Sequence, residues 1–303
     1  MAIRRRMRDF IDPEVVARLS AIPLDARLPM IGNVSGRHRS PTRGSSLEFS
    51  EYRKYVPGDD TRRLDWRTWG RTDRFYIREY EADTNLRLCL IVDVSGSMAY
   101  CPSGQKTGPD SKLDYARRLA GTLAWLAASQ GDAVGLFCAG ESFKREIPPR
   151  RSSTNLRHVL DEMGAMRAEG TTGLPDALHI AAEKIPQRAL VVIISDLMMD
   201  PELLRSGFQH LRFRRHDVVV FHLMEKNEID FDFDRPVRFV DLEGLPPMLI
   251  DPISIAKEYR KAVQTYLENI KTMTRDSAVD YRRVGLEQNY ADVLAQFLLA
   301  RKR

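Results

Sequence analysis

The chain has 303 residues, of which 43% are hydrophobic, so it is long enough to bury a sizeable core and suggests roughly two folding units. Its 47 basic and 42 acidic side chains are interspersed, and the net charge of +5 favours a mixed, solvated surface over a nucleic-acid interface. The longest apolar runs stop far short of the ~20 residues of a membrane helix, and no apolar signal-peptide core follows the basic start of the chain.

A dense string of polar and aromatic residues occupies positions 36–66, ahead of any long apolar run. Within it, Pro57, Gly58, Asp59 and Asp60 form a turn signal. Two interpretations stay open. The Arg and Asp residues around Trp66 can form ion pairs and stacking contacts that fix this arm to the rest of the fold. Alternatively, the string is a partner-binding surface, or its acidic residues feed a second metal, with these candidates: Arg53, Tyr55, Asp59, Asp60, Asp65 and Trp66.

Strand and helix patterns alternate between residue 86 and about residue 225, which predicts a doubly wound, mainly parallel α/β sheet of Rossmann-like type. Uninterrupted apolar runs predict buried strands. We expect strands at 86–93, 133–138, 189–194 and 217–223, and helices at 111–130, 154–166, 175–184 and 202–213.

The strand at 86–93 ends in the sequence Asp93-Val-Ser95-Gly-Ser97, which places one carboxylate and two hydroxyls at alternate positions. The carboxyl end of a strand is where an open α/β sheet presents ligand-binding groups. Oxygen donors of this kind suit Mg²⁺, with Mn²⁺ as an alternative. One carboxylate leaves such an ion under-neutralised, so that it can accept a carboxylate from another molecule. The competing interpretation is a turn that caps the following helix.

The last third of the chain predicts a strand at 237–241, a long helix at 252–274 and a final helix at 291–301. We therefore expect an N-terminal arm or small subdomain at 1–85, a sheet domain at 86–230 and a C-terminal extension at 231–303 that packs on the sheet.

Three cysteines without metal-ligand spacing argue for a reducing compartment, and we expect a cytoplasmic protein. Cys89 and Cys138 fall within predicted strands, whereas Cys101 falls in a loop, where we expect an exposed side chain.

Asp93-x-Ser95-x-Ser97 at a strand end resembles the metal-ion-dependent adhesion site of von Willebrand factor type A domains. In that family a loop Thr and a second strand-end Asp complete the site. The resemblance implies Thr172 for the first, with Thr171 as the alternative, and Asp196 for the second.

The polar string is similar to the signature of the domain of unknown function 58 family. In that family the signature precedes a von Willebrand factor type A domain. The matching residues are Gly36, His38, Ser40, Arg53, Tyr55, Pro57, Gly58, Asp59, Asp60, Leu64, Asp65, Trp66 and Arg71. The resemblance runs from about residue 10 to the C-terminus. It implies a partner, an AAA+ ATPase of the MoxR type, and a role in chaperone-like assembly or maturation of a client protein.

The sequence therefore predicts a non-enzymatic, Mg²⁺-dependent protein-binding module that acts with the ATPase on a client bearing an acidic residue. Two alternatives are a metal-assisted hydrolase, with Asp59, Asp60 or Asp65 as the base, and an RNA-associated adhesion domain that uses the arginine-rich arm. Against the hydrolase, the sequence pairs no His or nucleophile with the strand-end cluster.

Overall fold

The computed structural model describes residues 9–26, 38–39, 48–54, 66–72, 75–81, 83–84, 86–101, 111–141, 145–233, 237–240, 242–243, 246 and 248–302. The chain divides into two compact units, one of which is Leu28–Leu86. The other combines Met1–Arg27 with Arg87–Arg303. This division differs from the arm expected at 1–85, because residues 9–26 group with the sheet. The expected boundary between 86–230 and 231–303 stays a prediction.

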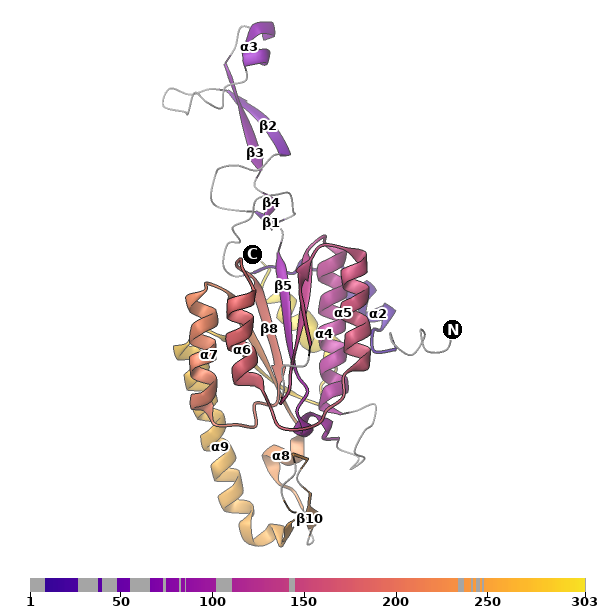
Figure 1. The fold of residues 1–303 in the computed structure, drawn as a ribbon, viewed down its shortest axis with the longest axis vertical. Coiled ribbons are helices and arrows are strands. Elements are labelled where there is room, and N and C mark those ends of the chain that lie inside the picture. The colour runs from indigo at the N-terminus through magenta and orange to yellow at the C-terminus, as the bar shows by residue number, and fades with distance from the viewer. Residues whose placement is uncertain are drawn as a thin grey trace. The chain divides into compact units, whose positions relative to one another are not determined.

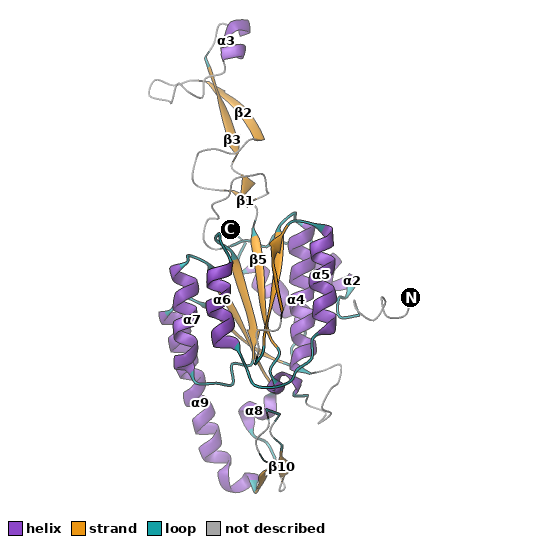
Figure 2. Ribbon diagram, in the orientation of Figure 1, coloured by secondary structure: helices purple, strands orange, loops and turns teal. Residues whose placement is uncertain are grey.

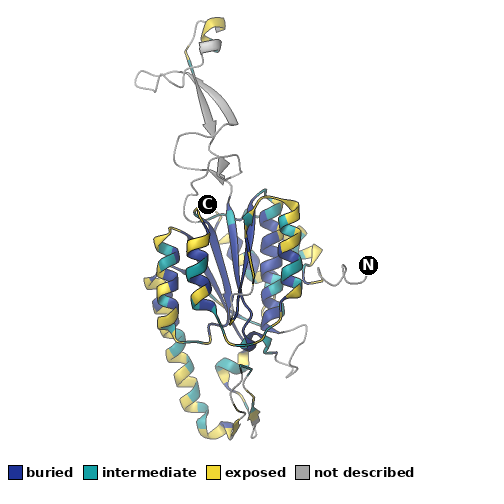
Figure 3. Cartoon of the chain, viewed as in Figure 1, coloured by how far each residue is buried: buried dark blue, intermediate teal, exposed yellow. Residues whose placement is uncertain are grey.

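A six-stranded sheet forms the centre of the larger unit (Figures 1 and 2). Its strand order is β12-β9-β8-β5-β6-β7, and every neighbouring pair is parallel except β6 and β7. The four inner strands are mostly apolar and are buried from end to end, apart from the first residue of β5, as expected for strands covered on both faces (Figure 3). The predicted α/β, mainly parallel sheet is confirmed. The bounds are β5 Arg87–Asp93, β6 Ala133–Ala139, β7 Arg145–Arg150, β8 Leu190–Ser195, β9 Asp217–Met224 and β12 Asp280–Gly285.

Helices cover both faces of this sheet. Because side chains alternate along a strand, Cys89 and Ile91 face α6, α7 and α9 in one apolar core. On the other face, Phe221 of β9 meets Phe297 of α10 edge to face, with ring centroids 5.2 Å apart. The helices are α4 Lys112–Ser129, α5 Ser153–Ala165, α6 Leu174–Lys184, α7 Pro201–Phe213, α8 Lys226–Asp230, α9 Pro252–Asp276 and α10 Tyr290–Leu299, with a short 3-10 helix η2 at Gly96–Ala99.

Segments near both ends of the chain pack within the larger unit. Helix α2 (Pro13–Leu19) contacts α4, and a side chain at Gly121 of α4 would lie 2.6 Å from the ring of Phe10. Near the C-terminus, the buried Arg301 donates to Asp217 of β9 at 2.8 Å. The contacts of Phe10 and α2 explain why residues 9–26 group with the sheet and not with the polar string.

Two edge strands were not predicted. Strand β7 contains two consecutive prolines and pairs antiparallel with β6, which is tolerated because an edge strand needs backbone donors on one side only. Strand β12 carries charged side chains and is mostly half-buried. Cys101 also differs from expectation, since it is buried with 4% of its surface exposed.

A small appendage follows β9. Helix α8 is succeeded by an antiparallel pair, β10 (Val237–Phe239) and β11 (Met248–Ile250), and then by α9. Figure 1 shows α8 and β10 beyond the end of the sheet, beside the first turns of α9. Strand β10 is shorter than the predicted strand at 237–241.

Within its described residues, the smaller unit shows two strand pairs and one helix. Strand β2 (Glu48–Lys54) pairs antiparallel with β3 (Tyr76–Glu81), and β1 (His38–Arg39) pairs with β4 (Asp83–Thr84). Helix α3 spans Trp66–Thr72, and the ring of Trp69 stacks on that of Phe75 with centroids 5.9 Å apart.

Candidate functional site

Three loops meet at the carboxyl end of β5, and backbone hydrogen bonds join them. The amide of Val94 donates to Ala139 at the end of β6, at 2.8 Å. Gly96 donates to the carbonyl of Gly170 at 2.8 Å, which ties the loop after β5 to the loop before α6. Gly170 has φ +71°, a conformation that glycine adopts without strain. The local fold therefore fixes the backbone on which the predicted metal ligands stand.

Asp93 is the centre of this arrangement. It is buried, with 1% of its surface exposed, and its Oδ1 accepts the Ser95 amide at 2.9 Å. Its Oδ2 accepts hydroxyl donors from Ser195 at 2.6 Å and from Thr172 at 3.3 Å. Burial and, next, the charge of Asp196 raise the pKa of Asp93 to about 6, against the hydrogen bonds from Ser195 and Ser95. The carboxylate is held in one orientation, next to a second negative charge.

The hydroxyls that were predicted as metal ligands lie near this carboxylate. Ser95 Oγ and Ser97 Oγ lie 3.0 Å apart, within hydrogen-bond distance. Thr172 is half-buried and contacts Asp93, whereas Thr171 is exposed. Of the two threonines that the sequence left open, the structure brings Thr172 to the site.

The second predicted carboxylate, Asp196, is buried at the end of β8 and is bound by a lysine that was not predicted. Lys112 Nζ donates to Asp196 Oδ2 at 2.8 Å and to Glu228 Oε1 at 2.6 Å. Only 1% of the Lys112 surface is exposed. Burial acts to lower the pKa of Lys112, but the charges of Asp196 and Glu228 outweigh it and the pKa is raised. Burial is also the main cause of the raised pKa of Glu228.

The loop after Asp196 has an unusual backbone. Leu197 has φ 51°, in the left-handed region that residues other than glycine rarely adopt. The Leu197 amide donates to Ser195 Oγ at 2.8 Å, and its carbonyl accepts the hydroxyl of Tyr266. Ser195 thus orients Asp93 and also holds the turn that follows Asp196.

These residues suit a hard divalent cation. Among the residues that the structure describes, no three His, Cys, Asp or Glu side chains come together as metal ligands, so a site here depends on hydroxyl oxygens. The donor set is all oxygen, which is the chemistry that Mg²⁺ and Mn²⁺ prefer. Because Asp196 raises the pKa of Asp93, a cation between the two would relieve their repulsion. We call Asp93, Ser95, Ser97, Thr172 and Asp196 the cradle.

The candidates in the polar string lie in the other unit. Arg53 is in β2, where its Cα pairs with that of Ile77 in β3, and Trp66 begins α3. Tyr55, Asp59, Asp60 and Asp65 lie outside the described residues. Their assignment to a partner surface stays a prediction.

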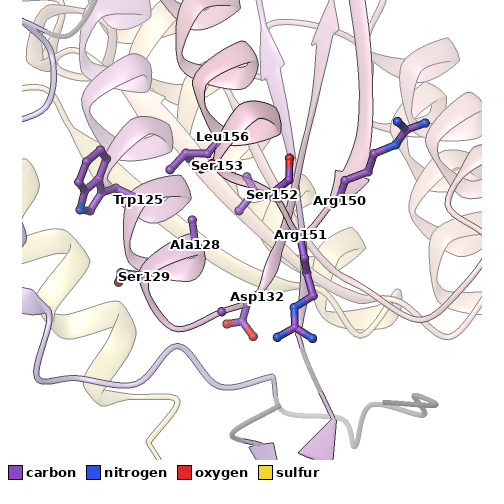
Figure 4. A pocket seen from close by; sticks show the side chains of 11 residues that line it. Trp125, Ala128, Ser129, Asp132, Arg150, Arg151, Ser152, Ser153 and Leu156 are labelled. Atoms are coloured by element: carbon purple, nitrogen blue, oxygen red, sulfur yellow. The ribbon is translucent and has the colours of Figure 1, made fainter. Parts of the chain in front are cut away.

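A cavity of about 380 Å³ opens at the opposite end of β6 from the cradle (Figure 4). Trp125 of α4, Arg150 of β7 and Ser152 at the start of α5 line it. None of the cradle residues lines it, so the cradle and the cavity lie at different places in the fold.

A family model described as "Protein of unknown function DUF58" matches residues 51–268. The chain belongs to the DUF58 family. Uncharacterized protein Rv1480 of Mycobacterium tuberculosis is 24% identical to it, over 97% of this chain and 92% of the relative. The family resemblance seen in the polar string is confirmed.

Solved structures with a similar fold include an aerotolerance-related membrane protein from Bacteroides fragilis, at 17% identity and a TM-score of 0.45, covering 71% of this chain and all of that one. The VWA domain of SpRpn10 is 11% identical with a TM-score of 0.40, covering 70% of this chain and 95% of that domain. In this DUF58 chain, the sheet order and the Asp93 loop at the end of the central strand make the fold von Willebrand factor type A-like, as the sequence predicted. In the described part of the chain, no helix combines the length and apolar character that a membrane span requires.

Proposed function

We propose that this DUF58 protein is a non-enzymatic, Mg²⁺-dependent protein-binding module. The observation that carries the proposal is the cradle: an oxygen-only donor set centred on the buried, hydrogen-bonded Asp93. The residues that would hold the ion are Asp93, Ser95, Ser97, Thr172 and Asp196. Mn²⁺ would suit the same donors.

A bound ion would supply an electrophilic centre that accepts a carboxylate from a partner. The protein's own part is positioning. Ser195 and the Ser95 amide orient Asp93, while Lys112 offsets part of the charge of Asp196. The hydroxyls of Ser95 and Ser97 add no charge, so the ion stays under-neutralised and favours an incoming anion.

The family resemblance supports a more specific role, in which the chain acts with a MoxR-type AAA+ ATPase on a client protein that presents an acidic residue. Cys89, Cys101 and Cys138 are all buried and are not joined by disulfides, which suits a reducing compartment and supports a cytoplasmic location. On this proposal, the polar string that contains Arg53 and Trp66 offers a second contact surface for the ATPase or the client.

The test measures binding of the purified chain to a MoxR-type ATPase from the same organism, by biolayer interferometry in Mg²⁺ and in EDTA. We expect binding by the wild type in Mg²⁺ only. Asp93→Asn removes the charged ligand and should abolish binding, and Ser97→Ala should weaken it by at least roughly tenfold. Asp276→Asn, at an exposed position of α9, is the matched control.

Circular dichroism of each variant separates loss of binding from loss of folding. Equal binding by the wild type, Asp93→Asn and Ser97→Ala, or binding that survives EDTA, would contradict a metal-dependent contact. The cradle would then be a structural polar cluster.

A further inference from the structure

Two residues between β10 and β11, Leu242 and Glu243, lie directly on the loop that carries the two cradle serines. A Cβ placed on Gly96 would be 2.2 Å from the carbonyl oxygen of Leu242 and 3.3 Å from Cγ of Glu243. Gly96 stands between Ser95 and Ser97, so this contact is made at the cradle itself. We call Leu242 and Glu243 the strap.

Aromatic packing fixes the strands that flank the strap. Phe239, at the end of β10, stacks on Phe231 with ring centroids 5.6 Å apart. Phe231 in turn stacks on Tyr259 of α9 at 4.2 Å, and Phe233 packs edge to face on Phe239 at 5.5 Å. The strap is therefore attached to the α8–α9 region by a cluster of four rings.

The same region is joined to the cradle by polar contacts. The hydroxyl of Tyr259 donates to the backbone carbonyl of Glu228 in α8 at 3.0 Å. The side chain of Glu228 binds Lys112, which binds Asp196. Hydrogen bonds and ion pairs thus connect α9 to the ligand Asp196 on one side, while the strap rests on Gly96 on the other.

The chemistry of Glu243 matches what an under-neutralised ion needs. Two bonds separate Cγ of a glutamate from its carboxylate oxygens, and its Cγ already lies against the loop that holds both serine hydroxyls. A carboxylate is a preferred ligand of Mg²⁺ and Mn²⁺, and affinity at such sites rises with the number of charged ligands. The strap brings to the cradle the same chemical group that a partner would bring.

We propose that Glu243 is an internal ligand of the cradle, whose carboxylate occupies the open position of the bound ion until the carboxylate of a partner displaces it. This inference rests on the proposed function, because it requires an ion in the cradle. The strap then competes with any partner for the open position of the ion. A weakly binding acidic ligand fails to displace Glu243, whereas a well-placed one displaces it and binds.

The test titrates Mn²⁺ into the full-length protein and measures free Mn²⁺ by electron paramagnetic resonance. We expect one site in the wild type, no site in Asp93→Asn, and roughly tenfold weaker binding in Glu243→Gln and Glu243→Ala. Glu268→Gln, on the exposed surface of α9, should bind as the wild type does. Added acetate should restore the affinity of Glu243→Ala, because a small carboxylate can replace a lost ligand but cannot replace a structural contact.

The outcomes separate the two proposals. If the wild type binds Mn²⁺ and needs Asp93, but Glu243→Gln binds equally well, the internal ligand is refuted and the metal site stands. Weaker binding that acetate does not restore, with a lowered Tm, also refutes it, because the strap then acts only through folding. No binding by the wild type refutes the metal site and the internal ligand together.

Discussion

Lys112 is the residue whose replacement should reveal most about the cradle. In Lys112→Met a side chain of similar length loses its ammonium group, and the carboxylates of Asp196 and Glu228 lose a partner at 2.8 and 2.6 Å. Lys112 and Asp196 are both almost wholly buried. Removing one member of a buried ion pair costs about 3–5 kcal/mol, because the charge left behind is uncompensated. We therefore expect the free energy of unfolding to fall by that amount at pH 7, and Tm to fall on the order of 10 °C.

The same change should strengthen metal binding. A metal ion in the cradle would neutralise Asp196 as the ammonium of Lys112 does, so the ion would become the main counter-charge once the ammonium is gone. A ligand at about 100 times its Kd stabilises the state that binds it by about 2.7 kcal/mol. Saturating Mg²⁺ should therefore recover a large part of the lost stability. Adding Glu228→Gln should recover a further part, because it removes the second unpaired carboxylate.

Urea unfolding followed by circular dichroism, in Mg²⁺ and in EDTA, checks both expectations. Lys271→Met removes an exposed lysine from α9 and is the matched control. A loss of stability no larger than that of the control would refute the ion pair as a source of stability. Equal stabilisation of wild type and Lys112→Met by Mg²⁺ would refute the competition between ammonium and metal.

Three further predictions concern glycines and a histidine. Gly96→Ala places a Cβ 2.2 Å from the carbonyl of Leu242, so it should displace the strap and lower Mn²⁺ affinity roughly tenfold, with no additional loss when combined with Glu243→Gln in a double-mutant cycle. Gly173→Ala places a Cβ 1.9 Å from the carbonyl of Gly140, so thermal unfolding and Mn²⁺ titration should show Tm and affinity falling together; unchanged affinity would separate the loop before α6 from the cradle. Burial, followed by the charge of nearby arginines, lowers the pKa of His216 to about 4. The unfolded chain therefore takes up this proton first as pH falls, and stability should be full above about pH 6.5 and decline by roughly 3 kcal/mol toward pH 4. In His216→Asn, whose amide oxygen can still accept the Ala189 amide, urea unfolding at several pH values should show a shallower decline.

The parts of the fold that the sequence predicted are those with strong local patterns. The apolar strand β8 was expected at 189–194 and is found at Leu190–Ser195. The helix expected at 111–130 is found at Lys112–Ser129, with Ser111 as its N-cap. Strand β12 escaped prediction because its charged residues do not alternate clearly, and its place at the sheet edge is set by its parallel pairing with β9. Strand β7 was also not predicted, because Pro148 and Pro149 are unusual in a strand.

At the site, the sequence predicted the residues that lie at the ends of strands. It missed Lys112, whose partners are distant in the sequence. Asp93 and Asp196 follow apolar strands, so their position could be inferred from local pattern. Lys112 could not be assigned in this way, because a lysine in the first turn of a helix is ordinarily solvated. Its partners lie 84 and 116 residues further along the chain. One sequence feature could have indicated burial of Lys112, because it directly precedes the apolar face of α4. Only the fold shows that two carboxylates contact it.

Two groups of the protein itself lie where the proposed function would place a metal ion and a partner's carboxylate: Lys112 and the strap. The ammonium of Lys112 stands in part for a cation beside Asp196, and the carboxylate of Glu243 is proposed to stand for that of a partner. Both belong to one connected network, because Lys112 binds α8 through Glu228 and α8 is tied to α9 through Tyr259. An ion that draws Asp196 away from Lys112 would therefore act on the region that carries the strap. Because linkage is reciprocal, a partner that lifts the strap must change the affinity for the ion by the same factor by which the ion changes the affinity for the partner. If the proposal holds, metal and partner would be selected together.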